Sequence, residues 1–424
     1  MNIVLIEPPH SYLVQQRTQP PIGLLYLAAI LRNHGHHCII HRLWDNAEDQ
    51  MEGIPEGDLY GISSTSLDYS TSVDIARYIK RTRTGPVIMG GYHATTKGDD
   101  EGVFDAICRG EGENVILDIV RDVEQGNLQK EYIGKPVDDL DTIPFPARDL
   151  LDYQGGNIFA FNENHFPYGS TVVVGSRGCP FRCAFCGAKH LLHAKPRSRT
   201  VDNVVAEIKH VIDTFNIRQF RFSDETFTLN KTYTFNLCER LHDLNIAWKC
   251  STRAGTLTLP VLQAMERAGC KEIAIGAESG DMNVLTTLLK DQTPEEVSQA
   301  CRAATNTGIN VRLLLMVNTP GESRETVKRN ISFLQNTPHH MASCTVFKPL
   351  PGSAIWDTPE RFGVQILSRD LSQYNIQLFR NDPEFDIMSE PPAIRIKDLD
   401  FESMYKNRRE MIEYLESKQC INKG

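Results

Sequence analysis

The stretch Gly178-Cys179-Pro180-Phe181-Arg182-Cys183-Ala184-Phe185-Cys186 decides the fold. It places three cysteines at a C-x3-C-x2-C spacing directly after the apolar run from Val172 to Val174. A short apolar run that ends at a glycine is typical of a buried strand leading into a loop. Three thiols on one loop suit a single iron–sulfur cluster, and a [4Fe–4S] cluster with three cysteine ligands keeps one iron open. An open metal position can bind and activate a small molecule.

Zinc and disulfides are the alternatives for these cysteines. Zinc would need a fourth ligand, which His190 or His193 can supply, but structural zinc favours paired C-x2-4-C units. Disulfides are unexpected within so short a span and without a secretory context. The other eight of the eleven cysteines stand alone, and most are expected to be small buried apolar residues: Cys38, Cys108, Cys238, Cys250, Cys270, Cys301, Cys344 and Cys420.

The cysteine motif resembles the C-x3-C-x-aromatic-C signature of radical S-adenosylmethionine (SAM) enzymes. Phe185 stands at the aromatic position, immediately before the third cysteine. The resemblance implies that Cys179, Cys183 and Cys186 hold a [4Fe–4S] cluster and that Phe185 contributes to the SAM site.

Composition sets limits on the class of protein. The chain has 424 residues, a length that predicts two or three domains. Its fractions of apolar residues (41%) and charged residues (23%) are ordinary for a globular protein. A net charge of −9 gives no sign of general nucleic-acid binding. No apolar run is long enough to span a bilayer, and the first residues lack the basic start of a signal peptide. Unpaired cysteines then predict a cytoplasmic protein.

Apolar runs and amphipathic stretches alternate through residues 1–135. The run Ile3–Ile6 predicts a first strand, and Ile22–Leu31, preceded by Pro20-Pro21 and followed by Gly35, predicts a first helix. The alternation continues with strands predicted at 38–43, 59–63, 87–89 and 106–108 and helices at 71–82 and 115–123. Such alternation is typical of a doubly wound parallel sheet of the Rossmann or flavodoxin kind, which binds ligands at the carboxyl ends of its strands.

Small and polar residues follow three of these strands, at 63–66, 90–95 and 110–113. With Pro20–Ala28, these segments resemble the cobalamin-binding domain at the N-terminus of cobalamin-dependent radical SAM enzymes. The D-x-H-x-x-G motif that places a histidine on cobalt is absent, so no cobalt ligand can be named, and a domain that has lost cobalamin is an alternative. The resemblance implies a cobalamin site at Ser64, Thr65, Ser66, Gly90, Gly91, His93, Thr95, Gly110 and Glu111.

Residues 136–166 lose periodicity and contain Pro144-Phe145-Pro146, which predicts a linker. Six strand–helix units follow within 167–360, with strands predicted at 171–175, 218–223, 246–252, 272–277, 311–317 and 343–348. They are too few for a closed eight-stranded barrel and resemble the open (β/α)6 barrel of radical SAM proteins. Residues 361–424 are expected to form a small, mostly helical extension.

The predicted barrel strands end in residues that match the family. Asp224 or Glu225 would receive the amino group of SAM, although either acid alone is also typical of a helix cap. Arg253 would hold the SAM carboxylate, unless it is a solvated charge. Gly276-Ala277-Glu278-Ser279-Gly280 resembles the family's G-x-E-S-G element, which implies SAM contacts for Glu278 and Ser279.

The resemblance implies that SAM is cleaved to a 5′-deoxyadenosyl radical, which most simply serves the cobalamin-dependent methylation of an unactivated carbon in a small molecule. A radical oxidation, cyclisation or rearrangement without methyl transfer is the alternative. A sensor that binds cobalamin or responds to redox state fits the SAM elements poorly. A reductant such as flavodoxin or ferredoxin is the expected partner.

Overall fold

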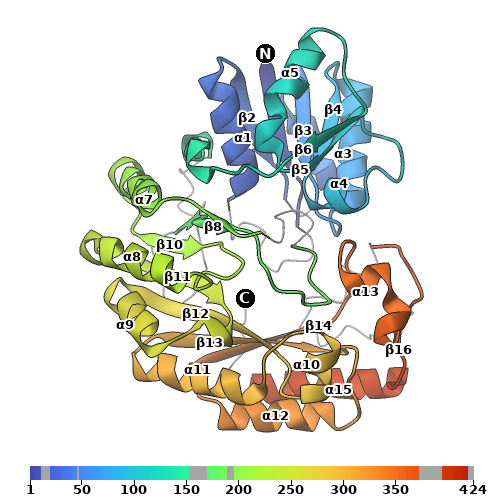
Figure 1. Ribbon diagram of the computed structural model, residues 1–424. Coiled ribbons are helices and arrows are strands. Elements are labelled where there is room, and N and C mark those ends of the chain that lie inside the picture. The colour runs from blue at the N-terminus through green and yellow to red at the C-terminus, as the bar shows by residue number, and fades with distance from the viewer. Residues whose placement is uncertain (11–19, 45–46, 152–169, 189–194, 372–393, 419–424) are drawn as a thin grey trace.

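The computed structural model describes residues 1–10, 20–44, 47–151, 170–188, 195–371 and 394–418. The chain forms two six-stranded parallel sheets, one above the other in Figure 1, each with its own helices. Over the described ranges, no helix combines the length and the apolar character that crossing a membrane requires.

The N-terminal sheet has the strand order β2-β1-β3-β4-β5-β6, and every neighbouring pair is parallel. The order reverses between β1 and β3, so this sheet is doubly wound, as predicted, and the reversal opens a crevice at the carboxyl ends of the strands. Its strands are β1 (Asn2–Glu7), β2 (His37–Arg42), β3 (Leu59–Ser63), β4 (Val87–Gly90), β5 (Ala106–Gly110) and β6 (Glu131–Gly134).

Helices cover both faces of this sheet. Ile3 and Leu5 of β1 pack under α1 and α5, whereas Val4 and Ile6 pack on the opposite face against α3. Burial on both faces explains why β1 is a continuous apolar run rather than an alternating one. The helices are α1 (Ile22–Asn33), α2 (Ala47–Gln50), α3 (Tyr69–Thr82), α4 (Tyr92–Thr96) and α5 (Ile116–Glu124).

The second sheet has the order β14-β13-β12-β11-β10-β7, again parallel throughout. It curves without closing, which confirms the predicted open (β/α)6 barrel. Its strands are β7 (Thr171–Val173), β10 (Gln219–Phe222), β11 (Ala247–Thr252), β12 (Cys270–Glu278), β13 (Asn310–Val317) and β14 (Met341–Val346).

Helices line the outer face of the barrel. Trp248 is fully buried there, and its ring meets Phe222 and Phe227 at centroid distances of 5.3 and 5.1 Å. Aromatic packing of this kind ties the second and third barrel strands to each other and to the loop that follows the second strand. The helices are α7 (Val201–Phe215), α8 (Lys231–Leu241), α9 (Leu259–Arg267), α10 (Met282–Thr287), α11 (Pro294–Asn306), α12 (Thr326–Asn336) and α13 (Ala354–Asp357).

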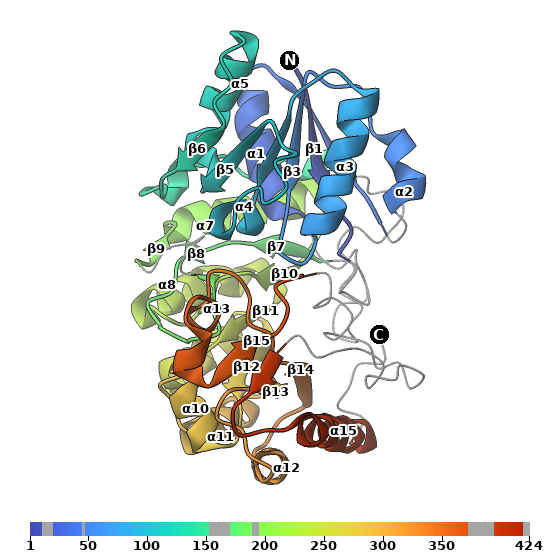
Figure 2. The same cartoon turned by 90° about the vertical axis from the view of Figure 1, so that its right-hand side faces the viewer.

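The C-terminal extension contains the helix α15 (Phe401–Ser417), which lies against α12 and β14 in Figure 2. Met411 and Leu415 from its apolar face enter the barrel core, so the helix is more than a solvated charged surface. An antiparallel pair, β15 (Val364–Ile366) and β16 (Ile394–Ile396), also belongs to this region. This pair was not predicted because strands of three residues carry almost no periodic signal.

Several short elements complete the chain. The two-residue strands β8 (Ser176–Arg177) and β9 (Arg197–Ser198) pair antiparallel beside the cysteine loop. Single 3-10 turns occupy Met51–Gly53, Gly112–Asn114, Leu140–Thr142, Arg148–Leu150, His242–Leu244, Ala254–Thr256 and Pro359–Phe362.

Candidate active site

The cysteine loop is held at its middle residue. The Ala184 N–H donates to the Leu288 carbonyl at 2.8 Å, and the Ala184 carbonyl accepts from the Ile355 N–H at 3.0 Å. Ala184 is fully buried between these neighbours, and the Cys186 N–H closes a turn on the Cys183 carbonyl at 3.1 Å. The backbone between the cysteines is therefore fixed by segments that follow the fourth and sixth barrel strands.

The three thiols of the loop are half-buried and unpaired. Burial raises the pKa of the Cys186 thiol, the nearby Cys183 and Cys179 thiols raise it further, and the Lys290 charge opposes the rise. Three such thiols are the donor set that an iron–sulfur cluster takes. Among the residues described, no three His, Cys, Asp or Glu side chains are grouped as for a single metal ion. His190 and His193, the alternative zinc ligands, lie outside the described residues.

Most of the isolated cysteines are buried, as expected: Cys38, Cys108, Cys238, Cys250, Cys270 and Cys301. Cys344 is half-buried, and Cys420 lies outside the described residues. Of the four half-buried cysteines among the described residues, three therefore belong to the cysteine motif.

Asp224 and Glu225 follow β10 and bind the segment that leads into the cysteine loop. Asp224 accepts hydrogen bonds from the Gly175 N–H at 3.1 Å and from the Ser176 hydroxyl, and Glu225 accepts from the Gly178 N–H at 3.0 Å. Neither acid caps the next helix, because Asn230 caps α8. Burial raises the pKa of Asp224 to about 6 and that of Glu225 to about 7. Glu225 is therefore poised between its neutral and charged forms near neutral pH.

Arg253 lies beside the cysteine loop and is not a solvated charge, since it is 7% exposed. Its Nη1 donates to the Cys183 Sγ at 3.3 Å, and its guanidinium carbon lies 3.8 Å from the Phe181 ring centroid. The sequence pattern could not supply this contact, because 70 residues separate the two partners.

Glu278 is the last residue of β12 and Ser279 follows it, and their side chains bond to different partners. Glu278 accepts a hydrogen bond from the Lys290 Nζ at 2.6 Å. The Ser279 hydroxyl donates to the Asn330 Oδ1 at 2.8 Å and is fully buried. Glu278 therefore belongs to the charged group near the cysteine loop, whereas Ser279 fastens the strand end to α12.

A cavity of about 440 Å³ lies at the carboxyl ends of the N-terminal strands. Apolar side chains and backbone atoms form most of its wall. The wall extends from Leu5 and Ile119 to Arg177 and Glu225, beside the barrel. This volume is in the range of small-molecule and cofactor sites. Six of the predicted cobalamin residues line it: Ser64, Thr65, Gly90, Gly91, Gly110 and Glu111.

Ser66, His93 and Thr95 do not line this cavity. His93 is buried, stacks on Tyr69 with ring centroids 3.9 Å apart, and faces the Ser66 hydroxyl at 3.3 Å. Burial lowers its pKa to about 4, so this histidine is neutral. Thr95 bonds to the backbone of Gly91 and Gly110 and so holds the two glycine turns together.

Two of the cavity glycines are required by the backbone. Gly91 has φ +92°, and a Cβ there would meet the Ser64 carbonyl at 2.8 Å. Gly110 has φ +80°, and a Cβ would overlap the Gly134 carbonyl. Because a side chain at either position would displace these strand ends, the cavity keeps its open form only with glycine. An open, mostly apolar wall with few polar groups fits a bulky cofactor such as cobalamin.

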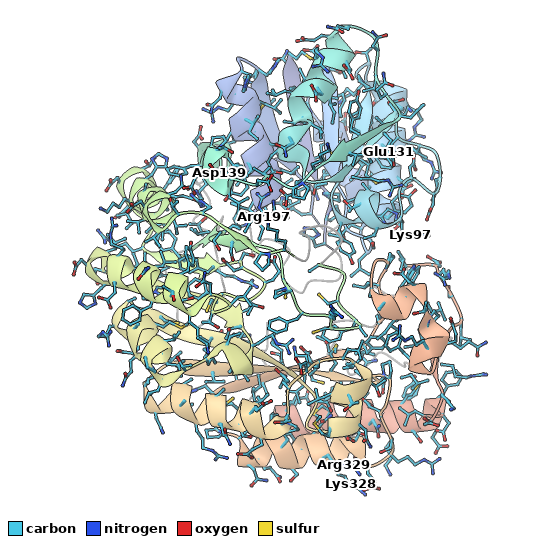
Figure 3. The ribbon with its side chains drawn as sticks, in the orientation of Figure 1. Lys97, Glu131, Asp139, Arg197, Lys328 and Arg329 are labelled. Atoms are coloured by element: carbon cyan, nitrogen blue, oxygen red, sulfur yellow. The ribbon has the colours of Figure 1, made fainter. Side chains whose placement is uncertain are left out.

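Arginines of the β8–β9 hairpin join the barrel to this cavity. Arg177 pairs with Glu113 at 2.6 Å, and Arg197 pairs with Glu111 and donates to the Val137 carbonyl at 2.6 Å. Figure 3 shows Arg197 at the junction of the two sheets. Sequence reasoning missed both arginines, since nothing in the local pattern separates a buried charge from an exposed one.

Comparison with known proteins agrees with this arrangement of fold and site. Residues 173–334 match the family model of the radical SAM superfamily, and residues 15–120 match that of the B12 binding domain. The chain is therefore an enzyme of the radical SAM class that carries an N-terminal cobalamin-binding domain.

Two relatives are similar to this chain over most of its length. An uncharacterized methyltransferase of Pyrococcus horikoshii, PH0819, is 29% identical over 386 residues, which cover 84% of this chain and 83% of the relative. The anaerobic magnesium-protoporphyrin IX monomethyl ester cyclase of Rubrivivax gelatinosus is 25% identical over 392 residues, which cover 84% of this chain and 68% of the cyclase.

Solved structures show the same fold. The radical SAM methyltransferase TsrM of Kitasatospora setae, solved with cobalamin and a [4Fe–4S] cluster, superposes with a TM-score of 0.72 at 15% identity, covering 97% of this chain and 90% of that one. The cobalamin-dependent SAM radical enzyme OxsB superposes with a TM-score of 0.65 at 19% identity, and the match covers 85% of this chain and 56% of OxsB.

Proposed function

We propose that this enzyme cleaves SAM at a [4Fe–4S] cluster held by Cys179, Cys183 and Cys186 and methylates an unactivated carbon of a small-molecule metabolite with the help of cobalamin. The observation that carries the proposal is the shared wall of the two sites. Arg177 and Glu225 line the N-terminal cavity, and Glu225 also accepts the N–H of Gly178, the residue before the first cysteine. A cofactor in the cavity would thus face the cysteine loop.

When bound, the cluster and SAM supply a carbon-centred radical, and cobalamin supplies the methyl group. The protein's own residues bind and orient these groups and exclude water from them. Phe185, Asp224, Glu225, Arg253, Glu278 and Ser279 are the proposed SAM residues. Of these, Glu225 is best placed to receive the SAM amino group, because its carboxyl group lies in the cavity wall and accepts the N–H of Gly178, the residue before the first cysteine.

The proposed cobalamin residues are the six that line the cavity, with Ser66, His93 and Thr95 supporting them from behind. The Thr95 hydroxyl donates to the Gly91 carbonyl at 2.9 Å and accepts from the Gly110 N–H at 3.0 Å. Tyr92 adds a contact to the other domain, because its hydroxyl donates to the Pro351 carbonyl at 2.7 Å. These bonds keep the cavity facing the barrel.

A second candidate is a radical cyclisation without methyl transfer. It is favoured by the similarity to the Rubrivivax gelatinosus cyclase, which extends over 84% of this chain. The electron donor and the compartment that we propose are the same for both reactions.

A reductant such as flavodoxin or ferredoxin would supply the electron in the cytoplasm, where the free cysteines of the described residues stay reduced.

The test is the iron and cobalt content of protein purified without oxygen from cells supplied with cobalamin. We expect about four irons and one cobalt per chain. The C179A, C183A and C186A variants should each lose most of the iron. C344A is the matched control, because Cys344 is half-buried outside the loop, and it should keep the iron.

Incubation with SAM that carries a labelled methyl group then separates the two reactions. Label in the product, with 5′-deoxyadenosine formed, supports methylation. An unlabelled, cyclised product supports the second candidate. Four irons with no cobalt would exclude cobalamin-dependent methylation, and wild-type protein without iron would exclude both.

A further inference from the structure

The loop between α10 and α11 carries unusual backbone strain. Leu289 has φ +52° and Asp291 has φ +42°, and Glu278, whose side chain reaches this loop, has φ +63°. The other described non-glycine residues with positive φ are asparagines, and aspartate and asparagine both tolerate that region, so the strain rests on Leu289 and Glu278. Strain of this kind persists only where the surrounding structure enforces it, and it gathers at functional sites.

Arg253 is one group that this loop holds. Its Nη2 donates to the Lys290 carbonyl and, at 3.0 Å, to the Asp291 carbonyl, so the strained backbone itself supplies the acceptors. Its Nη1 is then directed at the Cys183 Sγ. The guanidinium is nearly buried and has no carboxylate partner among the described ion pairs, so its charge acts mainly on the cysteine loop.

Lys290 is the second group. It is 5% exposed and stands between the two residues of the loop that have positive φ, Leu289 and Asp291. Its ammonium lies 2.6 Å from the Glu278 carboxylate oxygen and 5.8 Å from the centroid of the Phe185 ring, next to Cys186 in sequence. The loop therefore brings two buried cations to the cysteine motif, one at Cys183 and one near Cys186.

Cations and N–H donors near thiolate ligands favour the more negative, reduced state of an iron–sulfur cluster. We propose that Arg253 and Lys290 set the reduction potential of the cluster, and that the strained loop 289–291 positions them for this purpose. The inference rests on the proposed function, because it requires that the three cysteines hold the cluster. In this role Arg253 acts on the cluster rather than only on SAM, and Glu278 moderates the charge of Lys290.

The experiment is a potentiometric titration of the cluster, followed by electron paramagnetic resonance, in protein without added SAM. Dithionite supplies the single electron, and the cluster passes from its 2+ to its 1+ state. At a fixed potential, we expect R253Q and K290M each to lower the ratio of reduced to oxidised cluster about tenfold, which is about 59 mV for one electron. K328M is the control, because Lys328 is an exposed cation on α12, at the bottom of Figure 3.

The E278Q variant tests the sign. It keeps every cysteine and both cations but removes the opposing carboxylate, so the ratio should rise, opposite to K290M. General disruption of the loop would not produce opposite shifts. Ratios in R253Q and K290M that match K328M would overturn the proposal. Should either variant lose its iron, an unchanged or lowered ratio in E278Q would overturn it by itself. Wild-type protein without iron would instead refute the proposed function.

Discussion

At the scale of single residues, the two acids after β10 have different tasks although they are adjacent. Asp224 is buried and accepts hydrogen bonds from Gly175 and Ser176. Glu225 lies in the cavity wall, and its raised pKa leaves it near half-charged at neutral pH. Desolvation is the largest cause of both shifts. Hydrogen bonds from Ser176 and Gly175 oppose it at Asp224, and the Arg177 charge opposes it at Glu225, but neither effect cancels it.

The pKa of Glu225 predicts a pH-dependent stability. The pKa of Glu225 in the folded state, about 7, lies above the ordinary 4.5. Folding therefore favours the protonated carboxyl group, and the stability that this group contributes is fully present below pH 4.5 and is lost as the pH rises to about 7. We expect E225Q, which stays neutral, to be more stable than wild type by about 2 kcal/mol at pH 8 and by much less at pH 5. Urea unfolding of the apo-protein at both pH values measures this.

E416Q is the control for this comparison, since Glu416 is exposed on α15. It should change the free energy of unfolding equally little at both pH values. An E225Q effect of the same size at pH 5 and pH 8 would contradict the assigned pKa.

At the scale of elements, α7 is fastened to the barrel by one buried carboxylate. Glu207 has no exposed surface and pairs with both Arg148 and Arg199. Arg148 also donates to the Val172 carbonyl of β7 at 2.7 Å. Burial alone would raise the pKa of Glu207, but the two arginines hold it below its usual range. The linker, the first barrel strand and the first barrel helix therefore meet at one acid.

We expect E207Q to lower the free energy of unfolding by about 3–5 kcal/mol, because it leaves two buried arginines without their carboxylate. D202N is the matched control in the same helix, where Asp202 forms an exposed pair with Arg240. That change should stay within about 1 kcal/mol. Urea unfolding measures both, and equal effects of the two substitutions would show that burial of the pair is unimportant.

At the scale of the whole molecule, buried charge fixes how the two sheets face each other. Glu111 and Glu113 follow the fifth strand of the upper sheet, and Arg177 and Arg197 belong to the hairpin beside the cysteine loop. Hydrogen bonds from Arg197 hold the pKa of Glu111 below its ordinary value against the effect of burial. The glutamates at the cavity rim thus serve domain docking as well as shaping the cavity.

We expect R197Q to loosen this junction. Amide hydrogen exchange should become at least about tenfold faster in 110–113 and 176–177, with no change in α15, because opening there no longer breaks a buried ion pair worth more than about 1.4 kcal/mol. E131Q is the control, because Glu131 pairs with Arg109 at an exposed position on β6. Unchanged exchange in R197Q would show that the Arg197–Glu111 pair does not hold the two domains together.

Much of the fold follows from local sequence. The apolar runs of β1 and β3, the proline and glycine that bound α1, and the six strand–helix units after Thr171 all indicated the elements seen, because parallel strands buried on both faces are apolar along their length. The domain boundaries at 135, 166 and 360 and the roles of the individual site residues stay predictions. His93 shows why, since a polar residue after a strand can as well be buried under an aromatic ring as face a ligand.

The sequence by itself determined the class of protein, because three cysteines within eight residues are close in any fold that forms the loop. Only the tertiary structure decided which charges surround them. Arg177 meets Glu113 across 64 residues, Arg253 meets Cys183 across 70, and Arg197 meets Glu111 across 86. Such pairs depend on the path of the whole chain, and no local preference distinguishes a buried arginine from one in water.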